Sequence, residues 1–226
     1  TGFGFALLGA PFLILLWDPK LMVAIIVPLV AIIDGMIVVQ GRRNLDWRRV
    51  LPMILSGAVG IPLGTFILLV IPAEALKFAI GIIVLLFALA LLAGYSLNIR
   101  RERLAGSIAG FLSGASLTST SLSGPPVALF MINQRWARDN FRTSQGLFHV
   151  VTDVLGAFSL AVGGVVTLNT LMVNLALLPA ALGGYALAIL LLPHIKQELF
   201  RRITILIVII AAVMAIGSVV AGGGGI

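Results

Sequence analysis

Seven hydroxyl side chains lie within residues 113–123 of an otherwise apolar chain, and Gly124-Pro125-Pro126 follows them directly. The apolar segments on either side are each too short to cross a bilayer alone, so the run is interpreted as a re-entrant loop between two half-helices. Ser123 can cap the second half-helix, and proline suits its first turn. A helix N-terminus carries partial positive charge and free N–H donors, which can bind an anion without a buried lysine. The candidate anion-binding residues here are Ser119, Thr120, Ser121, Ser123, Gly124 and Pro125.

A similar stretch near the start of the chain adds to this prediction. Gly9-Ala10-Pro11 corresponds to Gly124-Pro125-Pro126 at an offset of 115 residues. If the two halves have opposite orientations, both helix ends meet near the middle of the bilayer, where several donors converge on an oxyanion. Gly2, Gly4 and Gly9 would let the backbone approach such a ligand closely. Helix packing is the structural alternative for any single serine or threonine of the run.

Gln145, His149 and Asp153 are spaced four residues apart, which places them on one face of a helix. Asp153 falls in the middle of an apolar segment, as does Asp34 in the first half of the chain. Ionisable groups inside a membrane are costly and are usually functional. Two interpretations stay open: His149 and Asp153 form a proton-accepting pair that responds to a pH gradient, or the aspartates accept structural hydrogen bonds from free N–H groups at the re-entrant turns.

The composition indicates a multi-pass membrane protein, which we expect in the inner cell membrane. Hydrophobic residues make up 60% of the 226 residues, charged residues only 10%, and the mean hydropathy is +1.17. A soluble domain carries about 25% charged residues. Basic residues in cytoplasmic loops account for the net charge of +7, so no nucleic-acid partner is expected. Cysteine is absent, which excludes disulfides and thiolate metal sites, and we expect no cofactor and no metal.

The apolar segments predict an all-α fold with an internal repeat. Membrane-spanning helices are expected at about 20–40, 49–71, 74–98, 140–162, 168–192 and 198–221, with a short element at about 3–16 and half-helices at about 104–115 and 124–134. Asp34 matches Asp153 at an offset of 119 residues. Residues 1–98 are therefore expected to form a first repeat, incomplete at its N-terminus, and residues 99–226 a second. Each repeat holds a re-entrant or broken helix and three transmembrane helices.

The basic residues predict that the two repeats are inverted. The loop at 41–49 carries four arginines, whereas its counterpart at 163–168 carries no charge. The following loop has only Lys77, whereas its counterpart near 196–202 has three basic residues. If segment 104–134 enters and leaves on one side, 13 of the 15 basic residues are cytoplasmic, and if it crosses fully the split is 7 against 8. The positive-inside rule therefore favours a hairpin.

These motifs resemble a known family. The patterns G-F-L-S-G at 110–114, S-G-P-P-V-A-L-F at 123–130 and N-F-R-T at 140–143 resemble the second repeat of the TauE/SafE family, the sulfite-exporter or TSUP group. Residues 2–11 and D-W-R at 46–48 resemble the first repeat. The family pattern usually has glycines where this chain has Ser119, Thr120, Ser121 and Ser123. The resemblance implies two inverted halves that export or import sulfite, organosulfonates or related small anions.

The expected function is a secondary transporter that moves a small sulfur-containing anion, sulfite or an organosulfonate, by alternating access. Export and proton coupling are further expectations. An anion channel of the same fold is the nearest alternative, because re-entrant half-helices also build channel filters. An intramembrane hydrolase using Ser113 or Ser116 with His149 and Asp153 is a third, ranked low because these serines lie in a run rather than at one sharp turn. The sequence leaves open whether the protein is a monomer or a homodimer in the bilayer.

Overall fold

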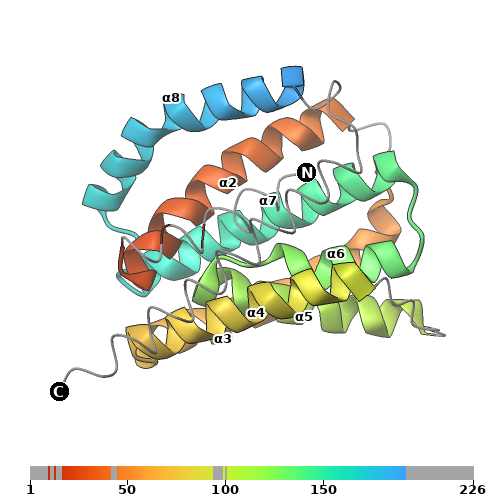
Figure 1. The fold of residues 1–226 in the computed structure, drawn as a ribbon, viewed down its shortest axis with the longest axis horizontal. Coiled ribbons are helices and arrows are strands. Elements are labelled where there is room, and N and C mark those ends of the chain that lie inside the picture. Colours follow the sequence, from red (N-terminus) through yellow and green to blue (C-terminus); the bar gives the residue numbers. More distant parts are fainter. Residues whose placement is uncertain are drawn as a thin grey trace.

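The protein is helical, without strands, wherever its structure, a computed structural model, describes the chain: residues 17–41, 45–93 and 101–191, with single residues 10, 13 and 99. Seven α-helices lie in this part (Figure 1). They are α2 (Pro19–Gly41), α3 (Trp47–Val70), α4 (Ala73–Ala93), α5 (Glu102–Thr120), α6 (Gly124–Asn133), α7 (Arg138–Val162) and α8 (Leu168–Leu191). The element expected at about 3–16 lies almost wholly outside the described residues, and the span expected at 198–221 lies wholly outside them.

Four helices are long and apolar enough to cross a membrane: α2, α3, the Asn140–Val162 part of α7 and the Leu168–Leu190 part of α8. The shortest of these has 23 residues. At 1.5 Å per residue it rises about 35 Å, more than the roughly 30 Å of the hydrocarbon core. Large apolar side chains also face outward, as at Val59 and Phe66 of α3, which are 67% and 62% exposed. The prediction of several membrane-spanning helices is confirmed.

Helices α3 and α5 run in parallel and pack backbone against backbone. A Cβ on Gly114 would overlap the carbonyl oxygen of Gly57. Three more glycines of this interface have no room for a Cβ against the opposite helix: Gly60, Gly64 and Gly110. Thr118 Oγ1 donates a hydrogen bond of 2.8 Å to the carbonyl oxygen of Ile61, across the same interface. Small residues thus let the two helices pack closely, and this packing gives the end of α5 a fixed position.

Helices α2 and α7 pack in antiparallel directions. Gly41, at the end of α2, lies against Thr143 near the start of α7, and about two turns further into the bundle Asp34 contacts His149. Helix α8 runs along the outside of α2 (Figure 1). The α2–α7 interface therefore joins the two halves of the chain in the middle of the bundle.

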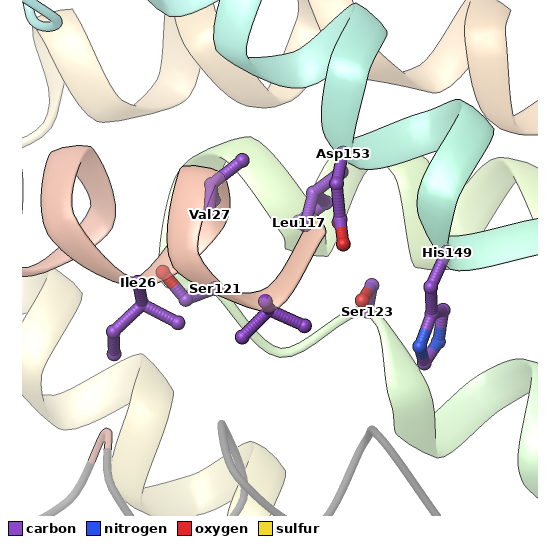
Figure 2. A pocket seen from close by; sticks show the side chains of 8 residues that line it. Ile26, Val27, Leu117, Ser121, Ser123, His149 and Asp153 are labelled. Atoms are coloured by element: carbon purple, nitrogen blue, oxygen red, sulfur yellow. The ribbon is translucent and has the colours of Figure 1, made fainter. Parts of the chain in front are cut away.

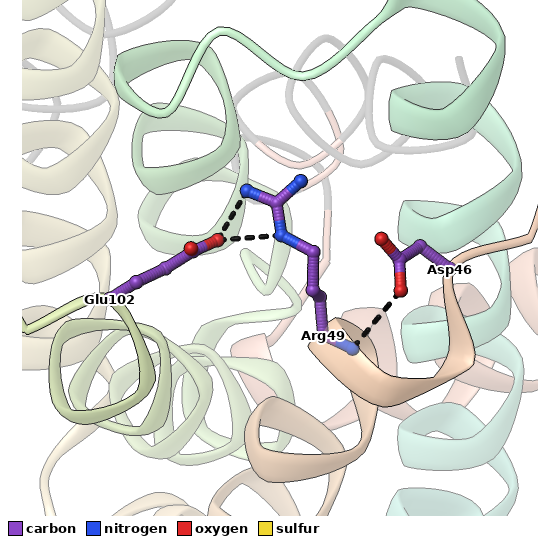
Figure 3. Close-up of polar contacts among 3 residues, drawn as sticks. All are labelled: Asp46, Arg49 and Glu102. Atoms are coloured by element: carbon purple, nitrogen blue, oxygen red, sulfur yellow. Dashed lines mark hydrogen bonds and ion pairs between the residues drawn. The ribbon is translucent and has the colours of Figure 1, made fainter.

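The hairpin formed by α5 and α6 enters and leaves the bundle at one end, where Arg49 contacts the start of α5 (Figure 3) and also a residue just beyond α6. Arg49 Nε donates to Glu102 Oε1 at 2.7 Å, and Nη2 pairs with the same oxygen. The Arg49 guanidinium also lies 4.2 Å from the centre of the Trp136 ring, just beyond α6. Asp46 caps α3 by accepting from the Arg49 backbone N–H at 3.4 Å. This arrangement agrees with the hairpin that the basic residues predict.

Candidate functional site

The break between α5 and α6 is shorter than the sequence predicts. Helix α5 runs to Thr120 rather than to about residue 115, and only residues 121–123 separate it from α6. Ser121 ends α5 in the left-handed region, with φ 61° and ψ 11°. That conformation costs about 1 kcal/mol for an L-residue. The prediction of a loop throughout 113–123 is therefore wrong.

The hydroxyls of Ser119 and Thr120 explain this difference, because both bond within the helix. Ser119 Oγ donates to the carbonyl oxygen of Ala115 at 2.7 Å, and Thr120 Oγ1 donates to that of Ser116 at 2.8 Å. Serine and threonine commonly bond four residues back in this way, which lets them stay helical. The protons of Ser119 and Thr120 are thus already used. The hydroxyl of Ser121, which is 1% exposed, has no partner among the described residues.

The start of α6 offers fewer donors than an ordinary helix end. Pro125 and Pro126 stand in its first turn, as predicted, and neither carries an N–H. Of the first four residues, only Gly124 and Val127 can donate from the backbone. Ser123 precedes the helix, but its side chain makes no capping hydrogen bond, so that prediction is wrong. Its backbone is in the right-handed region, φ −73° and ψ −26°, rather than in the extended region from which a capping side chain reaches back.

A small cavity lies where this break meets α2 and α7 (Figure 2). Its walls are Ile26, Val27 and Val30 of α2, Leu117 of α5, Ser121 and Ser123 of the break, and His149 and Asp153 of α7. Measured for the centre of a water molecule, its volume is about 10 Å³. That is close to the least space that holds one water, and it is too little for an anion with three oxygens. This conformation therefore leaves no room for such an anion at the break.

Asp34 and His149 join the two halves of the chain beside this cavity. His149 Nδ1 lies 3.0 Å from Asp34 Oδ2, and both side chains are at most 1% exposed. The predicted pair of His149 and Asp153 is therefore wrong. Spacing along one helix places His149 and Asp153 on a common face, but α2 packs against that face and supplies the nearer carboxylate.

Asp153 and Gln145, on the same face of α7, are buried without such a partner. Neither carboxyl oxygen of Asp153 and neither amide atom of Gln145 has a hydrogen-bond partner among the described residues. The alternative prediction, in which N–H groups of the turn hold Asp153, is not met within that part of the chain. In Figure 2 the carboxyl group of Asp153 points toward Ser123. The buried carboxyl group of Asp153 and the unpartnered hydroxyl of Ser121 thus line one cavity.

The remaining predicted residues are not brought into this arrangement. Gly2, Gly4 and Gly9 lie outside the described residues, so the predicted meeting of two helix ends stays a prediction. Within the described part of the chain, no group of three or more His, Asp or Glu residues has the geometry to hold a metal ion.

Sequence reasoning missed the apolar wall of the cavity and the contact at the end of the hairpin. Val30 lies four residues before Asp34, on the same face of α2, and this spacing is the one signal that could have identified it. Arg49, Glu102 and Trp136 are far apart in the sequence, and nothing in their spacing indicates that they meet.

Comparison with known proteins gives one family. The family model described as Sulfite exporter TauE/SafE matches residues 1–215. Comparison with curated proteins and with solved structures gives no match.

Proposed function

Because the chain belongs to the TauE/SafE sulfite exporter family, it is a multi-pass membrane transporter, and we propose that it exports a small sulfur-containing anion, sulfite or an organosulfonate. The observation that carries this proposal is the break between α5 and α6. The unpartnered hydroxyl of Ser121 and a second serine, Ser123, line one cavity there, and helix α6 begins directly after Ser123. Such a helix end attracts an anion and needs no positively charged side chain to do so.

Within the site, we assign the anion contacts chiefly to the break itself. The donors are the Ser121 hydroxyl, the Ser123 hydroxyl and the Gly124 backbone N–H, with Pro125 fixing the start of α6. Ser119 and Thr120 are weaker candidates, because binding through their protons would first break hydrogen bonds to their own helix. Gly2, Gly4 and Gly9 of the first half complete the proposed site.

Two inverted repeats, residues 1–98 and 99–226, are part of the proposal. The antiparallel packing of α2 against α7 supports it, because inverted repeats are related by a two-fold axis in the membrane plane. Such an axis between α2 and α7 would exchange the two helices. The offset that relates Asp34 to Asp153 also relates Val30 to His149. The contact between Asp34 and His149 thus has a counterpart in Val30 and Asp153, which line one cavity. Each repeat would hold one broken helix and three spans.

Alternating access is the mechanism that this geometry favours. The cavity has room for about one water, so a sulfite ion would need the break to move away from α2. The close packing of α3 on α5 favours movement elsewhere, at the face that α2 and α7 present to the break. We further propose that this movement is coupled to protons at the buried polar face that Asp34, His149, Asp153 and Gln145 form.

The TauE/SafE family is a family of transporters and not of enzymes, so the hydrolase alternative is set aside. His149 is also bonded to Asp34 rather than to a serine.

The test is flux of ³⁵S-labelled sulfite into proteoliposomes, with and without an imposed pH gradient, and with taurine, sulfoacetate, sulfate and lactate as competitors. Saturable flux that the gradient drives, and that one sulfur anion blocks, would support a proton-coupled carrier. Flux that does not saturate would indicate the channel alternative. Absence of flux for folded protein would contradict the proposal.

A matched pair of variants locates the site. Ser121→Ala removes a hydroxyl without a partner, and we expect the KM for sulfite to rise about tenfold or more, since a hydrogen bond to a charged group contributes roughly 1.5–3 kcal/mol. Ser56→Ala removes a hydroxyl that bonds only to Met53 of its own helix α3, and its KM should stay unchanged. Equal kinetics for the two variants would move the site away from the break.

A further inference from the structure

The carboxyl group of Asp153 is buried beside the proposed anion site without a counter-charge of its own. The side chain is 1% exposed, and neither oxygen has a partner among the described residues. It lines the same cavity as Ser121 and Ser123. An uncompensated carboxylate is costly in such a place and is relieved by a proton or by a partner.

The two halves of the chain treat their aspartates differently. Asp34 has a nitrogen partner, since His149 Nδ1 lies 3.0 Å away. The residue that corresponds to His149, at the offset of 119 residues, is Val30, and Val30 faces the cavity beside Asp153. Asp34 therefore has a histidine partner, whereas Asp153 has a valine at the corresponding position.

The charges that face this cavity limit what Asp153 can do there. Among the described residues, His149 of α7 lines the cavity beside Asp153, and it is bonded to Asp34 of α2. The α5–α6 break contributes only the hydroxyls of Ser121 and Ser123. An ionised Asp153 would repel an anion bound at the break, whereas a neutral carboxylic acid has an O–H that can donate to it.

We propose that Asp153 binds the transported anion directly, in its neutral form, through a hydrogen bond from its carboxyl O–H to an oxygen of the anion. The proton stays on Asp153 while the anion is bound and is lost to water after the anion leaves. One proton thus enters the site with each anion. This inference rests on the proposed function, and it assigns the coupling to Asp153 while Asp34 and His149 remain a fixed pair.

The test is sulfite binding to the purified protein by titration calorimetry across a range of pH, for wild type and Asp153→Asn. Asparagine keeps an N–H donor and never carries charge, so it imitates the neutral acid. If one proton enters with each anion, wild-type affinity falls about tenfold more steeply per pH unit than the affinity of the variant, once Asp153 is ionised in the free protein. The protonation of sulfite itself is common to both proteins and cancels in this comparison.

Three results would overturn the inference. Equal slopes for the two proteins would show that Asp153 takes no proton with the anion, and loss of binding in folded Asp153→Asn would show that its charge is required. Absence of sulfite binding by wild type at every pH would remove the proposed function and this inference with it.

Two further variants serve as a matched control and as a second route. Asp18→Asn makes the same exchange at an exposed aspartate that does not line the cavity, and we expect it to keep the wild-type pH slope. Val30→His supplies Asp153 with the partner that Asp34 has, which should hold the carboxylate ionised and weaken sulfite binding at least tenfold. Unchanged affinity in folded Val30→His would contradict the inference even if Asp153→Asn does not fold.

Discussion

The α3–α5 interface and the α2–α7 interface hold the same bundle together by different means. Between α3 and α5, glycines bring backbone against backbone, and the hydroxyl of Thr118 bonds to a carbonyl oxygen of the facing helix. Between α2 and α7, one buried polar pair is formed and a neighbouring carboxyl group is left without a partner. A cavity lies beside the second interface, where the α5–α6 break meets it.

This difference indicates that the α3–α5 interface is a rigid framework and that the side of α2 and α7 facing the break is a working face. Close backbone packing leaves few alternative arrangements, because any shift creates overlaps or voids. Buried polar groups without partners are tolerated where a ligand or a movement supplies the missing bonds. The end of α5 is held by α3 on one side, and the break that follows it faces α2 and α7 on the other. The break can therefore stay in place while α2 and α7 move against it.

The largest effect on stability is expected from His149→Leu, which removes the partner of Asp34. Removing one member of a buried pair leaves the other uncompensated, and we expect a loss of about 3 kcal/mol in the free energy of unfolding. Unfolding by SDS titration, followed by circular dichroism, measures it. The double variant Asp34→Leu with His149→Leu replaces both groups by apolar side chains and should recover most of the loss. A double variant as unstable as the single one would show that packing, rather than the pair, holds α2 to α7.

A smaller effect is expected at the framework from Gly114→Ala, whose Cβ would overlap the carbonyl oxygen of Gly57. Overpacking of this kind costs about 1–3 kcal/mol. Gly35→Ala is the matched control, because no atom lies within 4 Å of its added Cβ, and alanine favours a helix by up to about 1 kcal/mol over glycine. The same unfolding assay should therefore move in opposite directions for the two variants. Equal shifts would contradict the close packing of α3 on α5.

The helices could be predicted from sequence because hydropathy and length determine them in a membrane. Expected bounds such as 20–40 and 140–162 differ from α2 and α7 by at most two residues at each end. The position of the helix break could not be predicted as well, because the hydroxyls of serine and threonine can form hydrogen bonds in two different ways. They can leave the helix to bind a ligand, or they can bond four residues back and remain helical, as Ser119 and Thr120 do.

The common helix face of the polar candidates could be predicted from sequence, whereas their pairing could not. Periodicity places Gln145, His149 and Asp153 on one face of a helix, and the structure agrees. Which of them acquires a partner depends on the helix that packs there, and an offset of four residues carries no information on that. The choice of Asp34 for His149 is a tertiary contact between residues 115 positions apart.

The last prediction separates stability from anion binding at Ser121, where α5 ends and the break begins. Ser121 adopts a left-handed conformation that glycine takes at no steric cost. Relief of about 1 kcal/mol of strain, set against the greater freedom that glycine loses on folding, leaves Ser121→Gly more stable by about 0.5 kcal/mol. Its KM for sulfite should nevertheless rise as much as in Ser121→Ala, because both variants lack the hydroxyl. Unfolding and flux, measured on the same preparation, test both expectations. If Ser121 served only to end α5, glycine would serve that purpose better and the KM would not change. A more stable variant with a wild-type KM would therefore remove Ser121 from the proposed anion site.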